Sequence, residues 1–306
     1  MSSCVFGPVP SRRLGRSLGI DLVPFKTCTY DCIYCQLGRT TRKTAEKKEW
    51  IPVEKVLRDI KEKLETMPDY ITFSGSGEPT LYSKIGELIL GIKEMTSVPV
   101  AVLTNGSMLS DIGVQESLME ADLVIPSLDA GDEDIFKYVN RPHESITFKS
   151  MIEGLKNFRS KYSGECWLEI FLLGGVTGIT SEVEKIAAIT RDIMPDWIQL
   201  NTVSRPPAED FAYPVLQSKM MEFAKIFGEN CEVISEGNDI FKETHYRVTL
   251  DNVLGMLERR PCTIKDISTG LGLHENEVVK YVQKLLTNGK LKCVKRKEHV
   301  YYEGIH

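Results

Sequence analysis

Stretches with helical periodicity alternate with short apolar runs over most of the 306-residue chain. Val53, Val56, Leu57 and Ile60 recur at helical spacing behind Pro52, which suits a first helical turn. Strands are expected over residues 17–23, 70–73, 98–103, 122–127, 167–173 and 197–201, and helices over 53–64, 81–95, 111–121, 148–158, 181–194 and 215–227. About six β/α units in succession predict an α/β fold with a parallel sheet and right-handed crossovers.

The pattern changes near the C-terminus. Residues 235–246 are polar and irregular, which indicates a linker. Beyond it, the sequence predicts helices around 253–257, 263–267 and 274–286, a turn at 270–272 and a hairpin over 291–302. Three helices followed by a hairpin favour a small winged helix-turn-helix domain. The predicted divisions are therefore a core over 1–234, a linker over 235–246 and a winged domain over 247–306.

Residues 1–16 are rich in proline and glycine, and we expect a loop there. The loop carries Arg12, Arg13 and Arg16 just before the first expected strand. Guanidinium groups in such a place suit phosphate or carboxylate binding. A solvated basic surface is the alternative interpretation.

Three cysteines, Cys28, Cys32 and Cys35, fall within eight residues. Thiolates bind soft metals and iron–sulfur clusters, and a four-iron cluster commonly takes four of them. With only three, one iron is left for an external ligand, which suits catalysis better than electron relay. A zinc site completed by another residue, or three unrelated core cysteines, are the alternatives. The remaining cysteines are scattered, and we expect each to be a separate thiol: Cys4, Cys166, Cys231, Cys262 and Cys293.

A glycine loop, Gly75-Ser76-Gly77-Glu78, follows the second expected strand. Glycines let a backbone approach a ligand closely, and a carboxylate accepts hydrogen bonds from an ammonium group. Polar residues also end the later strands, with Thr104-Asn105 after the third and Ser127-Leu-Asp129 after the fourth. Gln199, Asn201 and Arg205 lie at the end of the sixth strand, where they either face a substrate or serve the structure.

The cysteine spacing, followed by the glycine–glutamate loop at a strand end, resembles the radical S-adenosylmethionine (radical SAM) superfamily. The resemblance implies a partial (β/α)6 TIM-like barrel, a 4Fe-4S cluster on Cys28, Cys32 and Cys35, and SAM bound at the open iron. It further implies that an electron from the cluster cleaves the S–C5′ bond of SAM, and that the 5′-deoxyadenosyl radical abstracts hydrogen from a substrate. An electron donor such as ferredoxin or flavodoxin is implied as a partner.

The resemblance also implies roles for residues around SAM. Tyr34 would lie near the adenine, and the loop Gly75–Glu78 would contact the amino group, with Ser76 in place of the usual middle glycine. The strand ends would meet the ribose and the carboxylate of SAM through Thr104, Asn105, Ser127 and Asp129. The segment Gly174–Gly178 would leave space for the adenine. A closer likeness to the branch that contains the tRNA wyosine-base synthase is carried by residues 74–81, 127–130 and 140–142.

Composition indicates in which cellular compartment the protein is expected. The chain has no run of about 18 apolar residues and no apolar signal core at its start, so we expect neither a membrane span nor a secretory peptide. The clustered cysteines then favour a reducing compartment, and we expect a cytoplasmic protein. The net charge is −5, yet residues 246–306 hold 11 Lys/Arg against 7 Asp/Glu.

Two functions follow as hypotheses. The first is a radical SAM enzyme acting on an unidentified substrate, with RNA or another macromolecule as a candidate. The second is a SAM- and redox-sensing regulator that binds DNA through the winged domain. The basic hairpin residues Lys290, Lys292, Lys295, Arg296 and Lys297 favour nucleic-acid contact. Glu275 and Glu277, at the start of the expected recognition helix, would repel phosphate and leave protein docking as the alternative.

Overall fold

The computed structural model describes residues 3–234, 248–271, 273–296 and 299–305. Within these ranges one sheet has the strand order β1-β2-β5-β6-β7-β8-β9-β10. All neighbours from β2 to β10 are parallel, whereas β1 pairs with β2 antiparallel. The strands are β1 (Val5–Ser11), β2 (Gly15–Ile20), β5 (Tyr70–Phe73), β6 (Val100–Thr104), β7 (Leu123–Pro126), β8 (Glu165–Leu172), β9 (Trp197–Thr202) and β10 (Cys231–Val233). A separate short pair is formed by β3 (Thr27–Cys28) and β4 (Arg42–Lys43).

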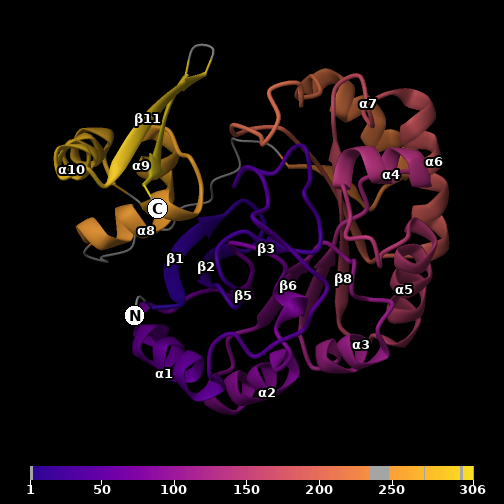
Figure 1. Ribbon diagram of the computed structural model, residues 1–306, viewed down its shortest axis with the longest axis horizontal. Coiled ribbons are helices and arrows are strands. Elements are labelled where there is room, and N and C mark those ends of the chain that lie inside the picture. The colour runs from indigo at the N-terminus through magenta and orange to yellow at the C-terminus, as the bar shows by residue number, and fades with distance from the viewer. Residues whose placement is uncertain (1–2, 235–247, 272, 297–298, 306) are drawn as a thin grey trace.

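Helices follow the strands along the chain and cover the outer side of the sheet, as Figure 1 shows for α1, α2, α3, α5, α6 and α7. They are α1 (Val53–Lys63), α2 (Ile85–Met95), α3 (Ile112–Leu118), α4 (Glu133–Asn140), α5 (Phe148–Lys161), α6 (Thr180–Ile193) and α7 (Gln217–Phe227). Parallel strands β2 and β5 to β9 thus alternate with helices. The predicted α/β fold with a parallel sheet is confirmed.

Local sequence explains why these elements form where they do. Strand β7 is buried at every position, as an apolar run in a parallel sheet covered by helices should be. Helix α3 begins at Asp111, whose carboxylate accepts a hydrogen bond from the backbone N–H of Val114. Helix α5 begins with a reciprocal capping box between Thr147 and Ser150.

The predicted loop over residues 1–16 is wrong from Val5 to Ser11, where the structure has strand β1. The prediction relied on Pro8 and Pro10 as strand breakers. However, β1 pairs only with β2 and forms the edge of the sheet, where a proline removes no hydrogen bond from a second neighbour. Edge position is a property of the whole sheet, which local sequence does not reveal.

Other boundaries differ in smaller ways. Helix α4 and strand β10 were not predicted, because each is short. Helix α2 starts at Ile85 rather than at 81, since residues Pro79–Leu81 form a 3-10 turn. The predicted turn at 270–272 is wrong for Gly270 and Leu271, which complete a helix, and residue 272 lies outside the described residues.

The C-terminal module comprises residues 248–305 where they are described. It contains α8 (Leu250–Arg259), α9 (Ile264–Leu271), α10 (Glu275–Thr287) and a hairpin of β11 (Leu291–Arg296) and β12 (His299–Gly304). Cys262, between α8 and α9, makes an antiparallel bridge to Tyr302 of β12. Three helices and a hairpin thus occupy the C-terminal region, and their assignment as a winged helix-turn-helix domain stays a prediction.

Two separate groups of apolar side chains form the interior. The larger one draws on the sheet and its helices, and the smaller one only on the C-terminal module, around Val253, Leu257 and Val282. This separation supports the proposed division into two domains; the predicted linker at 235–246 lies outside the described residues. The module contacts the edge of the sheet at β1, beside which Figure 1 shows it. No described helix is long and apolar enough to span a membrane.

Candidate active site

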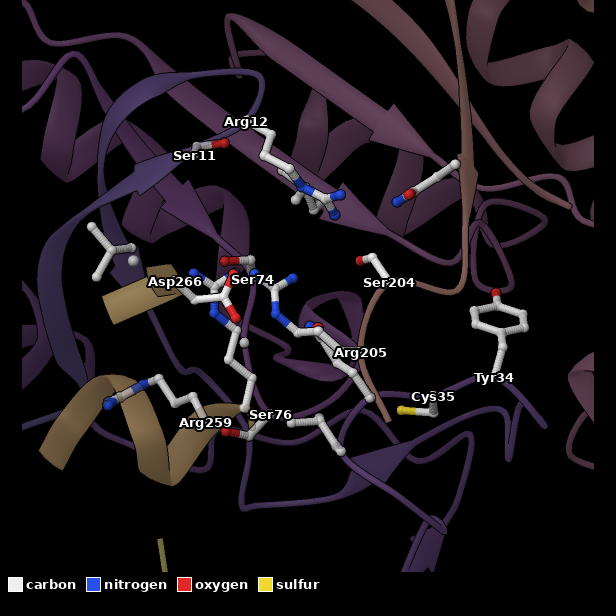
Figure 2. A pocket seen from close by; sticks show the side chains of 18 of the residues that line it. Ser11, Arg12, Tyr34, Cys35, Ser74, Ser76, Ser204, Arg205, Arg259 and Asp266 are labelled. Carbon is white, nitrogen blue, oxygen red and sulfur yellow. The ribbon is translucent and has the colours of Figure 1, made fainter. Parts of the chain in front are cut away.

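A cavity of about 930 Å³ opens at the carboxyl ends of the parallel strands. Active sites of parallel α/β barrels form at this end, because the loops that follow the strands converge there. The cavity is also lined by the C-terminal module, including residues of α8, α9 and the hairpin. Figure 2 shows Tyr34 and Cys35 on one side of this pocket and Arg259 and Asp266 of the module on the other.

Cys28, Cys32 and Cys35 all line this cavity as free, partly buried thiols. Burial raises the pKa of all three thiols, that of Cys28 to about 12, and for Cys28 the nearby Glu78 carboxylate adds to the rise. Thiols in such surroundings become thiolates when a metal centre supplies compensating positive charge. Within the described residues no three His, Cys, Asp or Glu side chains converge on one metal ion. In a four-iron cluster, each of the three thiols would bind a different iron.

Two amide side chains lie against the thiols. The Nδ2 of Asn105 donates to Cys28 Sγ at 3.5 Å and to Thr29 Oγ1 at 2.7 Å. The Nδ2 of Asn140 donates to Cys32 Sγ at 3.5 Å. Hydrogen bonds to ligand sulfurs tune the reduction potential of an iron–sulfur cluster. The surroundings of the thiols thus fit such a cluster.

The glycine loop packs against the segment that leads into the cysteines. A Cβ on Gly75 would lie 1.8 Å from Asp21 Oδ1, and one on Gly77 would lie 1.9 Å from the Thr27 carbonyl oxygen. Backbone hydrogen bonds join the two segments: Lys26 donates to the Ser76 carbonyl at 2.6 Å, and Glu78 donates to the Thr27 carbonyl at 3.1 Å. Glycine is needed at both positions because two backbones approach closely here.

Ser76 is held in place by Asp21, the residue that directly follows β2. The backbone N–H and the hydroxyl of Ser76 both donate to Asp21 Oδ1, at 2.9 and 3.1 Å. The other oxygen of Asp21 accepts from Arg259 Nε at 2.8 Å. Sequence reasoning did not single out Asp21, because its partners lie far apart along the chain.

Glu78 is 2% exposed, and its carboxylate accepts four hydrogen bonds from within the wall of the cavity. The donors are the N–H and hydroxyl of Thr80, the hydroxyl of Thr104 and the N–H of Asn105, at 2.6–3.0 Å. Burial raises the pKa of Glu78, and these donors oppose the rise. A carboxylate has about four acceptor sites, so Glu78 holds the end of β6 in place. Its predicted contact with the amino group of SAM stays a prediction.

Asp129 joins three elements beneath the cysteine loop. Its carboxylate accepts from the Tyr34 hydroxyl, from Asn140 Nδ2 at 2.8 Å and from the Phe171 N–H at 3.1 Å. Tyr34 also stacks on Phe171, with ring centroids 4.0 Å apart. Burial raises the pKa of Asp129 to about 6. The network orients Tyr34 and the amide that faces Cys32.

All twelve residues that the sequence singled out for the cluster and SAM line this one cavity. They are Cys28, Cys32, Tyr34, Cys35, Gly75, Ser76, Gly77, Glu78, Thr104, Asn105, Ser127 and Asp129. Their individual roles toward SAM stay predictions. Asn140 was missed as a site residue; only its place in the segment 140–142, compared with the wyosine branch, pointed toward it.

The glycines of segment 174–178 are not among the residues that line the cavity, and the expectation that they make space for adenine stays a prediction. A Cβ on Gly174 would lie 2.8 Å from the Pro214 carbonyl oxygen, and one on Gly178 would lie 2.3 Å from Val215. These glycines serve the close packing of two loops.

The three N-terminal arginines have different surroundings. Arg13 forms an ion pair with Glu169 at 2.7 Å, and Arg16 donates to backbone carbonyls of residues 66 and 67. Arg12 lines the cavity. Of the residues at the end of β9, Asn201 donates to Glu169 at 3.0 Å, Gln199 donates to Glu232 at 2.7 Å, and Arg205 lines the cavity.

Comparison with known proteins bears on this site. A sequence model described as the radical SAM superfamily matches residues 22–188, which include the cysteines, the glycine loop and strands β5 to β8. The chain belongs to the radical SAM superfamily. The superfamily's 4Fe-4S cluster and SAM are therefore the cofactors of this radical SAM protein, and the donor set described above fits both.

Similar proteins extend the comparison over the whole chain. A UPF0026 protein of Methanocaldococcus jannaschii is 33% identical to this radical SAM protein over 309 residues, covering 97% of the chain and 94% of the relative. A protein named GTPase Obg from Brachyspira hyodysenteriae is 40% identical over 293 residues, covering 94% of the chain. The chain spans only 43% of the length of that relative.

Solved structures support the fold. A radical SAM methyltransferase from Sphaerobacter thermophilus superposes with a TM-score of 0.54 at 16% identity, covering 73% of this chain and 68% of the other. This likeness concerns the fold alone. Together with the strand order, it establishes that the core is the partial TIM-like barrel expected from the sequence.

Proposed function

We propose that this radical SAM protein cleaves SAM reductively and activates a C–H bond of a substrate held between the barrel and the C-terminal module. The observation that carries the proposal is the single cavity, which is lined by the three thiols, by the glycine loop and by the module. When bound, the cluster and SAM supply a 5′-deoxyadenosyl radical that abstracts hydrogen.

The protein's own residues would bind the cluster and SAM and orient them. Cys28, Cys32 and Cys35 would hold the cluster, while Asn105 and Asn140 direct amide N–H groups at two of the sulfurs. Gly75 and Gly77 of the glycine loop and the polar groups of Thr104, Ser127 and Asp129 would hold SAM. Tyr34, stacked on Phe171, would give the adenine an aromatic neighbour.

The test uses protein reconstituted anaerobically with iron and sulfide. We expect the broad visible absorbance of a 4Fe-4S cluster, and release of 5′-deoxyadenosine from SAM when dithionite is added. Cys32→Ala should abolish both signals, whereas Cys293→Ala, which changes an exposed thiol of the hairpin, should abolish neither. A folded wild-type protein that binds no iron, or that leaves SAM intact, would refute the proposal. Flavodoxin or ferredoxin in place of dithionite tests the proposed electron donor.

The alternative, a redox-sensing regulator that binds DNA, is supported by the basic hairpin. The structure favours the enzyme instead, because α9 and Glu275 at the start of α10 line the cavity. The first turn of α10 is exposed, but it carries Glu275 and Glu277, whose carboxylates would repel the phosphates of DNA where recognition helices make their base contacts. Stoichiometric DNA binding that changes with the redox state of the cluster would reverse this preference.

The likeness to the tRNA wyosine-base synthase branch offers RNA as a substrate. Binding of transfer RNA by the reconstituted protein, measured against salt concentration, tests this hypothesis. Deuterium transfer from a candidate substrate into 5′-deoxyadenosine would identify the molecule that the radical meets.

A further inference from the structure

Guanidinium groups from three separate segments line one part of the cavity. Arg12 comes from the turn between β1 and β2, Arg205 from the loop after β9, and Arg260 from the residue directly after α8. We refer to these three residues as the arginine cluster. Figure 2 shows the side chains of Arg12 and Arg205 extending into the same region of the pocket. The barrel and the C-terminal module therefore both contribute positive charge to it.

The arginine cluster lacks the partners that its neighbours have. Arg13 pairs with Glu169, and Arg259 pairs with Asp21 at 2.8 Å. Among the described residues, by contrast, no member of the cluster forms an ion pair. The Nε of Arg205 is buried and has no hydrogen-bond partner there. Unpaired cations inside a protein are costly, and a bound anion offsets that cost.

Electrostatic repulsion within the cluster supports this interpretation. Burial and, after it, the charges of Arg205, Arg13 and Arg260 together lower the pKa of Arg12 to about 10, although the charge of Glu169 opposes them. Burial also lowers the pKa of Arg260, and Arg205 adds to this effect.

The nearest carboxylates are already engaged. Glu169 accepts from Arg13 and Asn201, and one oxygen of Asp266 accepts from the N–H and hydroxyl of Thr263 at 2.8 and 2.9 Å. Neither makes an ion pair with the cluster. Glu169 offsets part of the charge of Arg12, and Asp266 part of that of Arg260, and a bound anion would supply the remaining negative charge.

We propose that the arginine cluster binds the phosphate or diphosphate group of a small phosphate-ester substrate. Three guanidinium groups match an anion with several oxygens and about two or more negative charges, whereas a single carboxylate neutralises only one cation. This assignment rests on the proposed function and names its substrate class. Because the same cavity also reaches the three thiols, the anchored phosphate would direct the rest of the substrate toward them.

Two observations favour a small molecule over a nucleic-acid strand. The arginine cluster lies inside a cavity of about 930 Å³, which is the size of a small-molecule site. Strand-binding proteins instead present an open basic groove with aromatic platforms. The C-terminal module also lines the cavity with Met256, Thr269 and Tyr301.

The test measures binding of inorganic pyrophosphate to the full chain by calorimetry at constant ionic strength, without iron or SAM. We expect one pyrophosphate per chain. Arg205→Gln and Arg260→Gln should each weaken its affinity by about tenfold or more, and Arg205→Lys should weaken it less. Arg191→Gln, which removes one exposed charge on α6, should leave the affinity unchanged.

Thermal unfolding distinguishes a ligand site from a structural one. Pyrophosphate should raise the unfolding temperature of the wild type and of Arg191→Gln, and should not raise that of Arg205→Gln. Without pyrophosphate, Arg205→Gln should unfold at the wild-type temperature or above it, because one repelling charge is gone. If Arg205→Gln does not fold, Arg12→Gln replaces it in both measurements.

Three results would overturn the proposal. The first is a wild type that binds no pyrophosphate, and the second is an equal loss of affinity in Arg191→Gln. The third is a short RNA that binds through the arginine cluster more tightly than pyrophosphate does. SAM cleavage is measured separately on reconstituted wild-type protein, so failure of anion binding leaves the proposed function standing, and failure of cleavage leaves the anion site standing.

Discussion

Asp129 is 4% exposed and accepts hydrogen bonds from Tyr34, Asn140 and Phe171. In Asp129→Asn one acceptor oxygen becomes an amide that faces donors. We expect a loss of about 1–3 kcal/mol in the free energy of unfolding, because buried donors lose their partner. We also expect weaker SAM binding, because Tyr34 loses its orientation. Urea unfolding and calorimetry with SAM check both effects.

The matched control for that change is Asp134→Asn on the adjacent helix α4. Asp134 is exposed, so its replacement should alter stability by no more than about 0.5 kcal/mol. Equal effects from the two replacements would show that the buried network does not matter.

Gly77 offers a second test at the scale of single atoms. In Gly77→Ala the new methyl group would meet the Thr27 carbonyl oxygen, which belongs to the backbone next to Cys28. Overpacking of this kind costs about 1–3 kcal/mol, and displacement of the cysteine loop should reduce the iron bound per chain after reconstitution. Gly113→Ala, at an exposed position of helix α3, should keep the full iron content, because its new methyl group would lie near the Asp111 side chain and not near the cysteine loop.

The sequence was most informative about single site residues. The three thiols occupy one short segment of the sequence, and so does the glycine loop, so both could be recognised without knowing the fold. In the structure both line the cavity. Asp21 and Asn140 were not found, because their roles depend on partners brought together by folding. The sequence pointed to only part of the arginine cluster. Arg12 and Arg205 were named as candidate binding residues, but nothing near Arg260 in the sequence connects it to them.

At the scale of elements, Arg259 at the end of α8 connects the C-terminal module to the glycine loop through Asp21. Its guanidinium also lies 3.8 Å from the centre of the Phe6 ring on β1. Arg259→Gln should therefore loosen the loop, and the amide of Ser76 should exchange with solvent about tenfold faster, which corresponds to about 1.4 kcal/mol.

Hydrogen exchange measured by mass spectrometry over residues 74–78 checks this expectation. Lys280→Gln, on the exposed face of α10, supplies the control and should leave that exchange unchanged. Unchanged exchange in Arg259→Gln would mean that the module and the loop are mechanically independent.

Elements differ in how well sequence predicts them. The helices with a long apolar stripe, such as α1 and α5, begin within a residue of the expected position, because a clear period is preceded by Pro52 in the first and by a capping box in the second. Strand β1 was missed because proline tolerance depends on its place at the sheet edge. Helix α4 was missed because eight residues hold too few turns to display a period.

At the scale of the whole molecule, reversing the charge of the basic hairpin tests whether the protein is an enzyme or a regulator that binds nucleic acid. Lys292→Glu combined with Lys295→Glu reverses charge on β11, outside the residues that line the main cavity. If the module serves the cavity, 5′-deoxyadenosine release and pyrophosphate affinity should both stay at wild-type levels. A regulator that reads DNA would instead lose its DNA affinity, measured by fluorescence anisotropy. The double replacement Lys149→Glu and Lys161→Glu on α5 controls for net charge.

The cavity joins the ends of the barrel strands to a module that lies near the other end of the chain. Its thiol side belongs wholly to the barrel, whereas its arginine side is shared with the module. Substitutions in the module at positions other than Arg259, which contacts Asp21, can therefore accumulate without disturbing the residues that generate the radical. As relatives diverge, the substrate should therefore change before the way in which the radical is formed changes.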